Sequence, residues 1–163
     1  MIWLGIDPGP SRCGWALVEV GGGRPPRFVD GGHAPAEEVL RHLERASRVA
    51  LEWLAPGLFE RKRHDGLIGT ARVEGGLDWS LRQAGAQVTK LTAGQWRSDV
   101  VGRASPSDEE IAQVLRTRVT GLPVPPAVSV SQLVHVIDAV GVALAGSYQP
   151  GEQAKLALGR GRR

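Results

Sequence analysis

Short apolar runs separated by glycine and proline dominate the first third of the chain. Residues 2–6 form a run that ends in Asp-Pro-Gly, residues 13–20 form a second, and Gly-rich and Pro-rich turns precede a third at 27–31. Apolar runs of this length between turn residues are typical of β-strands. The pattern therefore predicts three strands that pair in order as an antiparallel meander.

Helical spacing of apolar residues first appears after Pro35. Between residues 35 and 54, leucine, valine and alanine recur at intervals of three and four, with glutamate and arginine on the opposite face. This spacing predicts an amphipathic helix that ends before Pro56. Residues 67–73 read as a strand that ends at Glu74, followed by a short helix over residues 78–84.

The second half of the chain predicts one more strand and three helices. The strand covers residues 87–91, and Thr92 is placed to cap a helix over residues 93–101. A second helix begins near Ser105, and a proline-rich loop covers residues 120–128. The last helix, residues 129–148, is apolar nearly all round except at His135 and Asp138. The order describes a mixed α/β domain over residues 1–150, with a flexible basic tail over residues 151–163.

Composition narrows the class of protein without deciding it. The 42% hydrophobic fraction is ordinary for a globular domain, and no apolar stretch is long enough to span a membrane. The N-terminus carries no signal-peptide pattern, and a single cysteine, Cys13, fits a reducing cytoplasm. The net charge is +3, and the cations are nearly all arginine, which suits phosphate. A GC-rich genome explains the arginine content equally well.

Four ionisable residues stand where the local pattern calls for apolar ones: Asp7, Glu74, His135 and Asp138. Buried carboxylates are costly unless they are paired or bind metal, and carboxylate oxygens are preferred ligands of Mg²⁺ and Mn²⁺. Two such ions can hold the attacking and leaving oxygens of a phosphodiester. Each residue also has a plainer interpretation, as a turn former, a solvated strand end or a surface histidine. The combination favours a metal site.

The opening IWLGIDPGPSRCGWALVEV resembles the first strand, turn and second strand of RuvC-type Holliday junction resolvases of the RNase H-like superfamily. Residues 71–74 (ARVE), 90–102 (KLTAGQWRSDVVG), 105–119 (SPSDEEIAQVLRTRV) and 135–146 (HVIDAVGVALAG) are similar to further segments of that family, in the same order. The resemblance spans residues 2–148. No single segment would be sufficient alone.

The resemblance implies an RNase H-like, mixed five-stranded sheet with three antiparallel strands first, then two parallel ones, flanked by helices. It implies a homodimer that binds a four-way DNA junction and nicks it symmetrically, leaving 5′-phosphate and 3′-hydroxyl ends. By the same resemblance Asp7, Glu74, His135 and Asp138 become the catalytic metal ligands, with two Mg²⁺ or Mn²⁺ ions per active site.

The chain also departs from the family pattern. Only about twelve residues separate Glu74 from the next predicted strand, so the helix used for dimerisation is expected to be short. A family lysine is missing near Asp108, and a family aromatic that opens the junction is replaced at Leu77. These departures fit a divergent branch, such as one encoded by a phage. The residues expected to contact DNA are Leu77, Trp79, Arg82, Arg97 and Arg103.

Three other functions remain open at this point. Actin-like ATPases and sugar kinases open with a similar strand and Gly-Ile-Asp motif, but they need a second phosphate loop that this sequence lacks. A non-catalytic DNA-binding module of the same fold is the second alternative. An RNase H-like nuclease for another substrate, such as an RNA precursor or a DNA flap, is the third.

Overall fold

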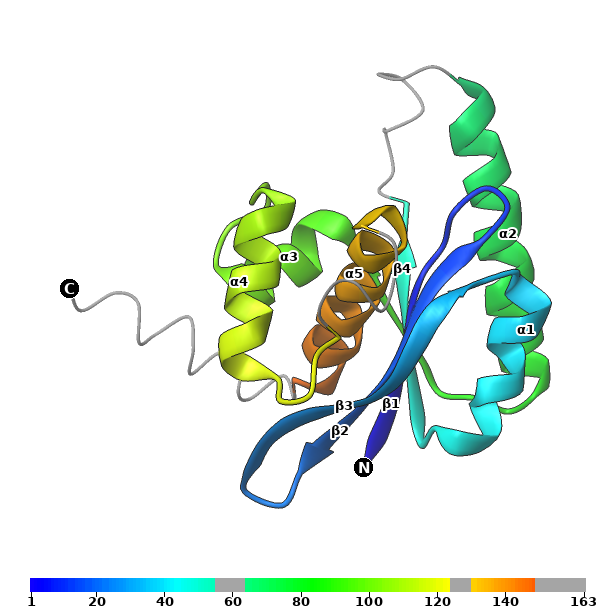
Figure 1. The fold of residues 1–163 in the computed structure, drawn as a ribbon. Coiled ribbons are helices and arrows are strands. Elements are labelled where there is room, and N and C mark those ends of the chain that lie inside the picture. The colour runs from blue at the N-terminus through cyan, green and yellow to red at the C-terminus, as the bar shows by residue number, and fades with distance from the viewer. Residues whose placement is uncertain (55–63, 124–129, 149–163) are drawn as a thin grey trace.

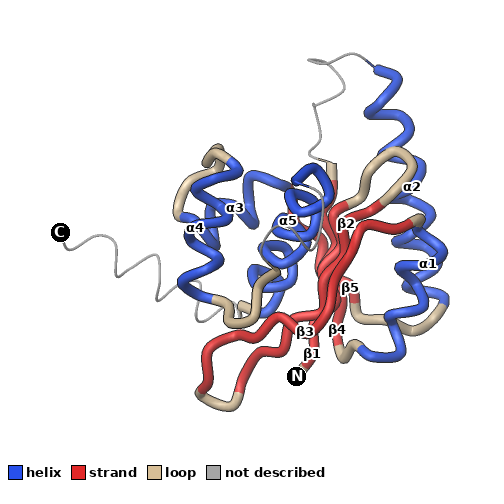
Figure 2. Tube along the Cα trace, in the orientation of Figure 1, coloured by secondary structure: helices blue, strands red, loops and turns tan. Residues whose placement is uncertain are grey.

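The computed structural model describes residues 1–54, 64–123 and 130–148, and it contains one five-stranded sheet in the order β3-β2-β1-β4-β5 (Figures 1 and 2). The strands are β1 (Ile2–Asp7), β2 (Cys13–Gly21), β3 (Arg24–Ala34), β4 (Arg48–Trp53) and β5 (Val88–Thr92). β1 pairs antiparallel with β2, and β2 with β3, whereas β1–β4 and β4–β5 are parallel. The predicted mixed sheet is confirmed.

Helices cover both faces of this sheet (Figure 2). One face carries α1 (Ala36–Leu40), the short 3-10 helix η1 (Arg41–Arg45) and α2 (His64–Gln83); the other carries α3 (Ala93–Val101), α4 (Asp108–Arg118) and α5 (Val130–Ser147). Each face has its own apolar core. Leu4, Leu51 and Leu77 belong to the α2 side, and Trp96, Ile137 and Val140 belong to the α5 side.

The segment between residues 48 and 53 is β4, so the prediction of one continuous helix over residues 35–54 is wrong there. Val49 and Leu51 face the α2 core, while Ala50 faces the α5 core. Because β4 is covered on both faces, it lacks the alternation of polar and apolar residues that marks a half-exposed strand. A short apolar run of this kind cannot be told from a buried helix turn by spacing alone.

The segment predicted as a strand over residues 67–73 belongs instead to α2, a helix of 20 residues. Val73, Leu77 and Leu81 follow each other at four-residue intervals and pack in the α2 core. The four glycines of this helix lower its intrinsic helix propensity, so the packed stripe stabilises it. The expectation of a short helix after Glu74 is therefore wrong, because Glu74 lies within a long one.

The remaining helices confirm the sequence prediction closely. Thr92 caps α3 and Ser107 caps α4, each in a reciprocal capping box. α5 covers nearly the whole of the predicted last helix. The proline-rich loop beyond residue 123 and the basic tail over residues 151–163 lie outside the described residues. No described helix is long and apolar enough to cross a membrane.

α5 lies unusually close to the sheet, because glycines face it from two strands. A Cβ atom on Gly5 of β1 would lie 2.0 Å from the carbonyl oxygen of Ala139, and one on Gly14 of β2 would lie 2.2 Å from that of His135. The contacts run in opposite directions along the two elements, since Gly14, which pairs with Asp7, meets His135, and Gly5 meets Ala139. α5 is therefore antiparallel to β1. The N-terminal half of α5 therefore lies over the end of β1 that carries Asp7.

Candidate active site

Two carboxylates stand side by side where two central parallel strands end. β1 ends at Asp7, and its register pairs Ile6 with Leu51 of β4, so the next residues, Asp7 and Glu52, are neighbours. Ile6 and Leu51 both pack in the α2 core. Since side chains alternate along a strand, Asp7 and Glu52 point to the other face, toward α5.

α5 brings two further predicted residues to the same place. The Nδ1 atom of His135 lies 2.8 Å from Oδ2 of Asp7. With the carboxylate of Asp7 as the acceptor, Nδ1 is the donor in this contact, and Nε2 is the ring nitrogen left for another ligand. Asp138 follows one helical turn later and is buried. The structure thus brings Asp7, His135 and Asp138 together, as the sequence predicted.

Glu52 is the member of this group that the sequence analysis missed. Nε1 of Trp96 on α3 donates to its Oε2 at 2.6 Å, which fixes the carboxylate from the helix side. A signal was present in the sequence: the apolar run before Glu52 ends in an acidic residue, as the run before Asp7 does. We refer to Asp7, Glu52, His135 and Asp138 as the acidic cluster.

Two carboxylates of the acidic cluster, Glu52 and Asp138, have a raised pKa. Burial, together with the charge of Asp7, raises the pKa of Glu52 to about 7 and that of Asp138 also to about 7. The hydrogen bond to Asp7 raises the pKa of His135. Each of these shifts favours binding of positive charge, whether a proton or a metal cation.

Arg97 of α3 is a cation that reaches this cluster. Its Nη2 atom lies 3.4 Å from Oδ2 of Asp138, a long ion pair, and its charge only partly opposes the rise in the pKa of Asp138 and Glu52 that burial causes. Within the described part of the chain, its buried Nε atom has no hydrogen-bond partner. A guanidinium with an unused buried donor is suited to bind another oxygen ligand, such as a phosphate.

Glu74 lies away from the acidic cluster, on α2 and therefore on the opposite side of the sheet. Its side chain is buried, and its Oε1 accepts a hydrogen bond from the backbone N–H of Leu54 at 2.9 Å. Lys90 is a nearby counter-charge. The prediction that Glu74 ends a strand is wrong, and Glu52 takes the strand-end position beside Asp7.

The chain is similar in sequence to curated crossover junction endodeoxyribonucleases named RuvC. It is 30% identical to RuvC of Corynebacterium glutamicum over 135 residues, which cover 76% of this chain and 61% of that protein. It is 27% identical to RuvC of a Nocardioides species over 165 residues, covering 94% of this chain and 90% of that protein. No protein-family model matches the chain.

Solved structures of Holliday junction resolvases are also similar to this chain. The structure of Thermus thermophilus RuvC in complex with a Holliday junction substrate matches with a TM-score of 0.65 and 27% identity, over 89% of this chain and 92% of that one. The chain is therefore similar to RuvC endonucleases both in sequence and in fold. Fowlpox virus resolvase, in its complex with Holliday junction DNA, matches over 96% of this chain and 99% of that one with a TM-score of 0.57 and 10% identity, which shows a shared RNase H-like fold.

The similarity to RuvC endonucleases suggests a divalent metal ion at this site, and the donors of the acidic cluster fit one chemically. Carboxylate oxygens are the preferred ligands of Mg²⁺ and Mn²⁺, and a neutral imidazole nitrogen is accepted better by Mn²⁺ than by Mg²⁺. The side chains are not preset for an ion: no three His, Cys, Asp or Glu groups among the described residues already converge on one point. In particular, Oδ2 of Asp7 is engaged by His135.

The residues predicted to contact DNA differ in their exposure and in their contacts within the chain. Leu77 is buried in the α2 core, so its predicted place at the DNA is wrong. Trp79 is 66% exposed on α2. Arg82 pairs with Asp78 within α2, and Arg103 pairs with Glu110 of α4. Arg97 alone of these three arginines contacts the acidic cluster.

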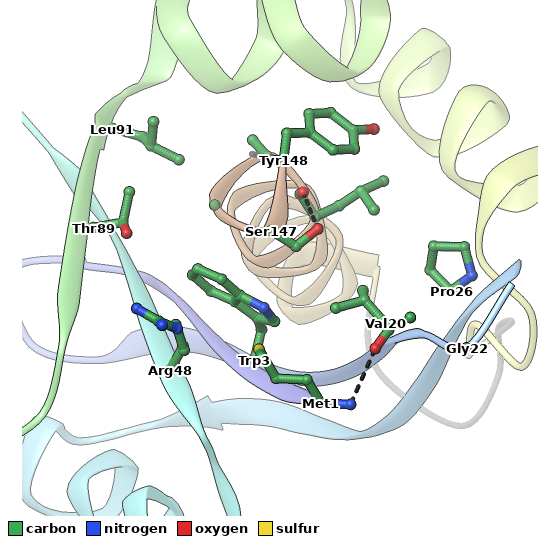
Figure 3. Close-up of a pocket in the computed structure, with 14 residues that line it drawn as sticks. Met1, Trp3, Val20, Gly22, Pro26, Arg48, Thr89, Leu91, Ser147 and Tyr148 are labelled. Atoms are coloured by element: carbon green, nitrogen blue, oxygen red, sulfur yellow. Dashed lines mark hydrogen bonds between the residues drawn. The ribbon is translucent and has the colours of Figure 1, made fainter. Parts of the chain in front are cut away.

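A wide hollow lies at the other end of the sheet, where β1 begins. Met1, Trp3, Arg48 and Tyr148 are among the residues that line it (Figure 3). Its described lining contains no acidic side chain. The full length of β1 separates this hollow from Asp7, so it is not part of the acidic cluster.

Proposed function

We propose that this protein is a structure-selective, metal-dependent DNA endonuclease that resolves four-way junctions. The observation that carries the proposal is the acidic cluster: two carboxylates at neighbouring strand ends, faced by His135 and Asp138 of α5. The similarity to named RuvC endonucleases supports the reaction, and the likeness to RuvC in complex with a junction supports the substrate. The chain spans 61% of the length of the C. glutamicum relative.

Asp7, Glu52 and Asp138 are the residues proposed to hold the metal, with Nε2 of His135 as a further ligand. Two Mg²⁺ or Mn²⁺ ions per site would supply the charge that activates a water molecule and stabilises the leaving oxygen of the phosphodiester. Glu52 replaces Glu74 in this set, because only Glu52 lies beside Asp7.

The chain's own groups prepare this site in three ways. Trp96 orients the carboxylate of Glu52 through its indole N–H. Asp7 orients the imidazole of His135 and keeps its proton on Nδ1, as carboxylates commonly do for metal-binding histidines. Arg97, whose guanidinium reaches the acidic cluster at Asp138, is placed to contact the phosphate that enters beside that residue.

The exposed face of α2 is the proposed dimer interface. Ile68 is 41% exposed and Trp79 is 66% exposed. Gly75 lies between them on the same helical face, where an added Cβ would meet nothing. A four-way junction has two-fold symmetry, and a symmetric dimer supplies one acidic cluster for each nick. Light scattering should therefore give a dimer mass, and Trp79→Asp should give a monomer.

A cleavage assay with labelled synthetic DNA tests the function directly. A four-way junction is incubated with the protein and Mg²⁺ or Mn²⁺, beside duplex DNA, a flap and an RNA–DNA hybrid of the same sequence. The expected result is paired nicks in opposing strands of the junction only, with 5′-phosphate ends. Preferential cleavage of the flap or the hybrid would instead identify a nuclease of another purpose with the same fold.

A further inference from the structure

One row of residues runs across the three antiparallel strands beside the acidic cluster. The register pairs Asp7 of β1 with Gly14 of β2, and Gly14 with His33 of β3. Directly paired residues in neighbouring strands project from the same face of a sheet. Asp7 and His33 therefore stand on the α5 face with a glycine between them.

Gly14 leaves a slot in this row that α5 fills. A Cβ at Gly14 would lie 2.2 Å from the carbonyl oxygen of His135 and 2.9 Å from its Cβ. Because that Cβ is missing, the backbone of α5 rests on β2 at this point, and the side chain of His135 starts between Asp7 and His33. A side chain at position 14 would lift His135 out of the slot.

The imidazole of His135 is held on both sides of this slot. On one side its Nδ1 atom lies 2.8 Å from Oδ2 of Asp7. On the other side the ring of His33 stacks against it, with the ring centroids 4.9 Å apart and the planes inclined by 7°. His33 is itself anchored by its pairing in the sheet and by Arg12, whose guanidinium donates to the carbonyl oxygen of His33.

We propose that His33 is a positioning residue that fixes the plane of the His135 ring and thereby the direction of its Nε2 atom. This inference rests on the proposed function, in which Nε2 is a ligand of the reaction site. A single hydrogen bond from Nδ1 leaves the ring free to rock about that bond, whereas a stacked neighbour removes this freedom. In parallel stacked rings the nitrogen atoms point along the planes and not at each other, so His33 acts through its flat face.

This interpretation predicts which substitution preserves the role. His33→Phe keeps a flat ring against His135 and removes both nitrogen atoms, while His33→Ala removes the ring. His42→Ala is the matched control, because His42 also stacks on an aromatic ring, that of Trp15, in the core on the other face of the sheet. All three variants are first compared with the unaltered protein by thermal unfolding.

Two measurements are made on each folded variant. The first is the rate of four-way junction cleavage at limiting and saturating Mn²⁺. The second, on the metal-free protein, is the downfield proton resonance of the His135 Nδ1–H group, which is sharp when the ring is held against Asp7. We expect His33→Ala to reduce cleavage about 10- to 100-fold, as is common for residues that orient a metal ligand, and to broaden the resonance. His33→Phe should keep the cleavage rate and the sharp resonance of the unaltered protein. His42→Ala should likewise leave the cleavage rate and the resonance unchanged.

The inference is overturned if His33→Ala cleaves at the unaltered rate and keeps a sharp resonance. It is also overturned if His33→Phe is as impaired as His33→Ala, because the nitrogen atoms and not the ring face would then be required. If the unaltered protein cleaves no DNA, the proposed function fails. The resonance alone then decides whether His33 holds His135.

Discussion

Two groups of buried and half-buried carboxylates lie on opposite faces of the same sheet, and their negative charge is compensated differently. On the α2 side, Nζ of Lys90 lies 2.7 Å from Asp78, Arg82 lies 2.9 Å from it, and the N–H of Leu54 satisfies Glu74. Although burial opposes it, the pKa of Asp78 is lowered by these two cations. Burial raises the pKa of Glu74 despite the hydrogen bond from Leu54, but the paired Asp78 is compensated by cations of the chain, as expected of a structural network.

On the α5 side, the acidic cluster lacks such compensation. Burial and the charge of Asp7 raise the pKa of Glu52 and of Asp138 to about 7, and Arg97 reaches Asp138 only at 3.4 Å. Perturbed carboxylates that are left under-neutralised are typical of functional sites, where a ligand supplies the missing charge. The contrast shows why burial alone does not identify a catalytic acid: Glu74 is buried as deeply as any residue of the cluster.

The largest effect that this contrast predicts is on cleavage. Glu52→Gln removes a proposed metal ligand and should reduce junction cleavage by 10²–10³-fold or more, the order seen when groups that stabilise transition-state charge are removed. Glu74→Gln keeps an acceptor for the Leu54 N–H and should cleave within a few-fold of the unaltered protein. Cleavage rates at saturating metal compare the two variants directly.

The affinity for junction DNA is the control for the comparison of Glu52→Gln with Glu74→Gln. DNA is gripped largely through its phosphates, so Glu52→Gln, Asp7→Asn and Asp138→Asn should all still bind the junction in a gel-shift assay. Full activity of Glu52→Gln together with an inactive, folded Glu74→Gln would reverse the assignment of the two faces.

The next effect concerns stability as a function of pH. In the metal-free protein the raised pKa values of Glu52 and Asp138 mean that the folded state retains protons that the unfolded chain has released. Their contribution to stability is therefore present at low pH and is lost as pH rises from about 4, the pKa of an unfolded carboxyl, to about 7. The unfolding temperature should fall between pH 5 and pH 8, and Mn²⁺ should restore it.

Asp78 should behave in the opposite way. Its lowered pKa means that its ion pairs stabilise the folded state above the unfolded pKa and lose this effect as pH falls. At pH 8, Asp78→Asn should lower the free energy of unfolding by about 1 kcal/mol, or about 2–4 °C in Tm for a domain of this size. Glu52→Gln should instead raise the Tm of the metal-free protein. If Asp78→Asn and Glu52→Gln lowered the Tm equally, the two groups of carboxylates would not differ in their effect on stability.

Much of the site was predictable because it depends on local features. The sequence shows an apolar run that ends at Asp7 and an apolar helix interrupted by His135 and Asp138. The fold that the family resemblance implies brings these three residues together. The prediction that Glu74 ends a strand failed because the strand beside β1 is β4, which is covered on both faces and shows no alternation. At the same time, the glycines of α2 lower its helix propensity, and its β-branched residues favour the prediction of a strand.

His33 could not be found from the sequence in the same way. Its position beside His135 depends on the register of three strands and on the missing Cβ of Gly14, and both are long-range properties. A one-residue shift in the pairing of β2 with β3 would place His33 on the other face. Spacing within one segment carries no information of this kind.

A smaller effect concerns the choice of metal. An imidazole nitrogen binds Mn²⁺ better than Mg²⁺, which prefers oxygen ligands, so His135 as a proposed ligand favours Mn²⁺. We expect higher activity with Mn²⁺ in the unaltered protein, and a shift of the activity ratio toward Mg²⁺ in His135→Asp. The ratio of cleavage rates with the two metals measures this. An unchanged ratio in His135→Asp would place the imidazole outside the ligand set.

The smallest effect is on the salt dependence of junction binding, and it separates the two faces once more. Each phosphate contact releases counterions, so loss of one contact reduces the slope of log affinity against log salt by about 0.9. Arg97 borders the acidic cluster, whereas Arg82 is paired with Asp78 on α2. We expect Arg97→Ala to reduce the slope by about one contact and Arg82→Ala to leave it nearly unchanged. The triple replacement of Arg82, Arg97 and Arg103 should then flatten the slope little more than Arg97→Ala does, unless Arg103 leaves Glu110 to reach DNA. If none of these replacements changes the slope, other cations of the chain contact the phosphates. The role of Arg97 would then be only to balance the charge of Asp138.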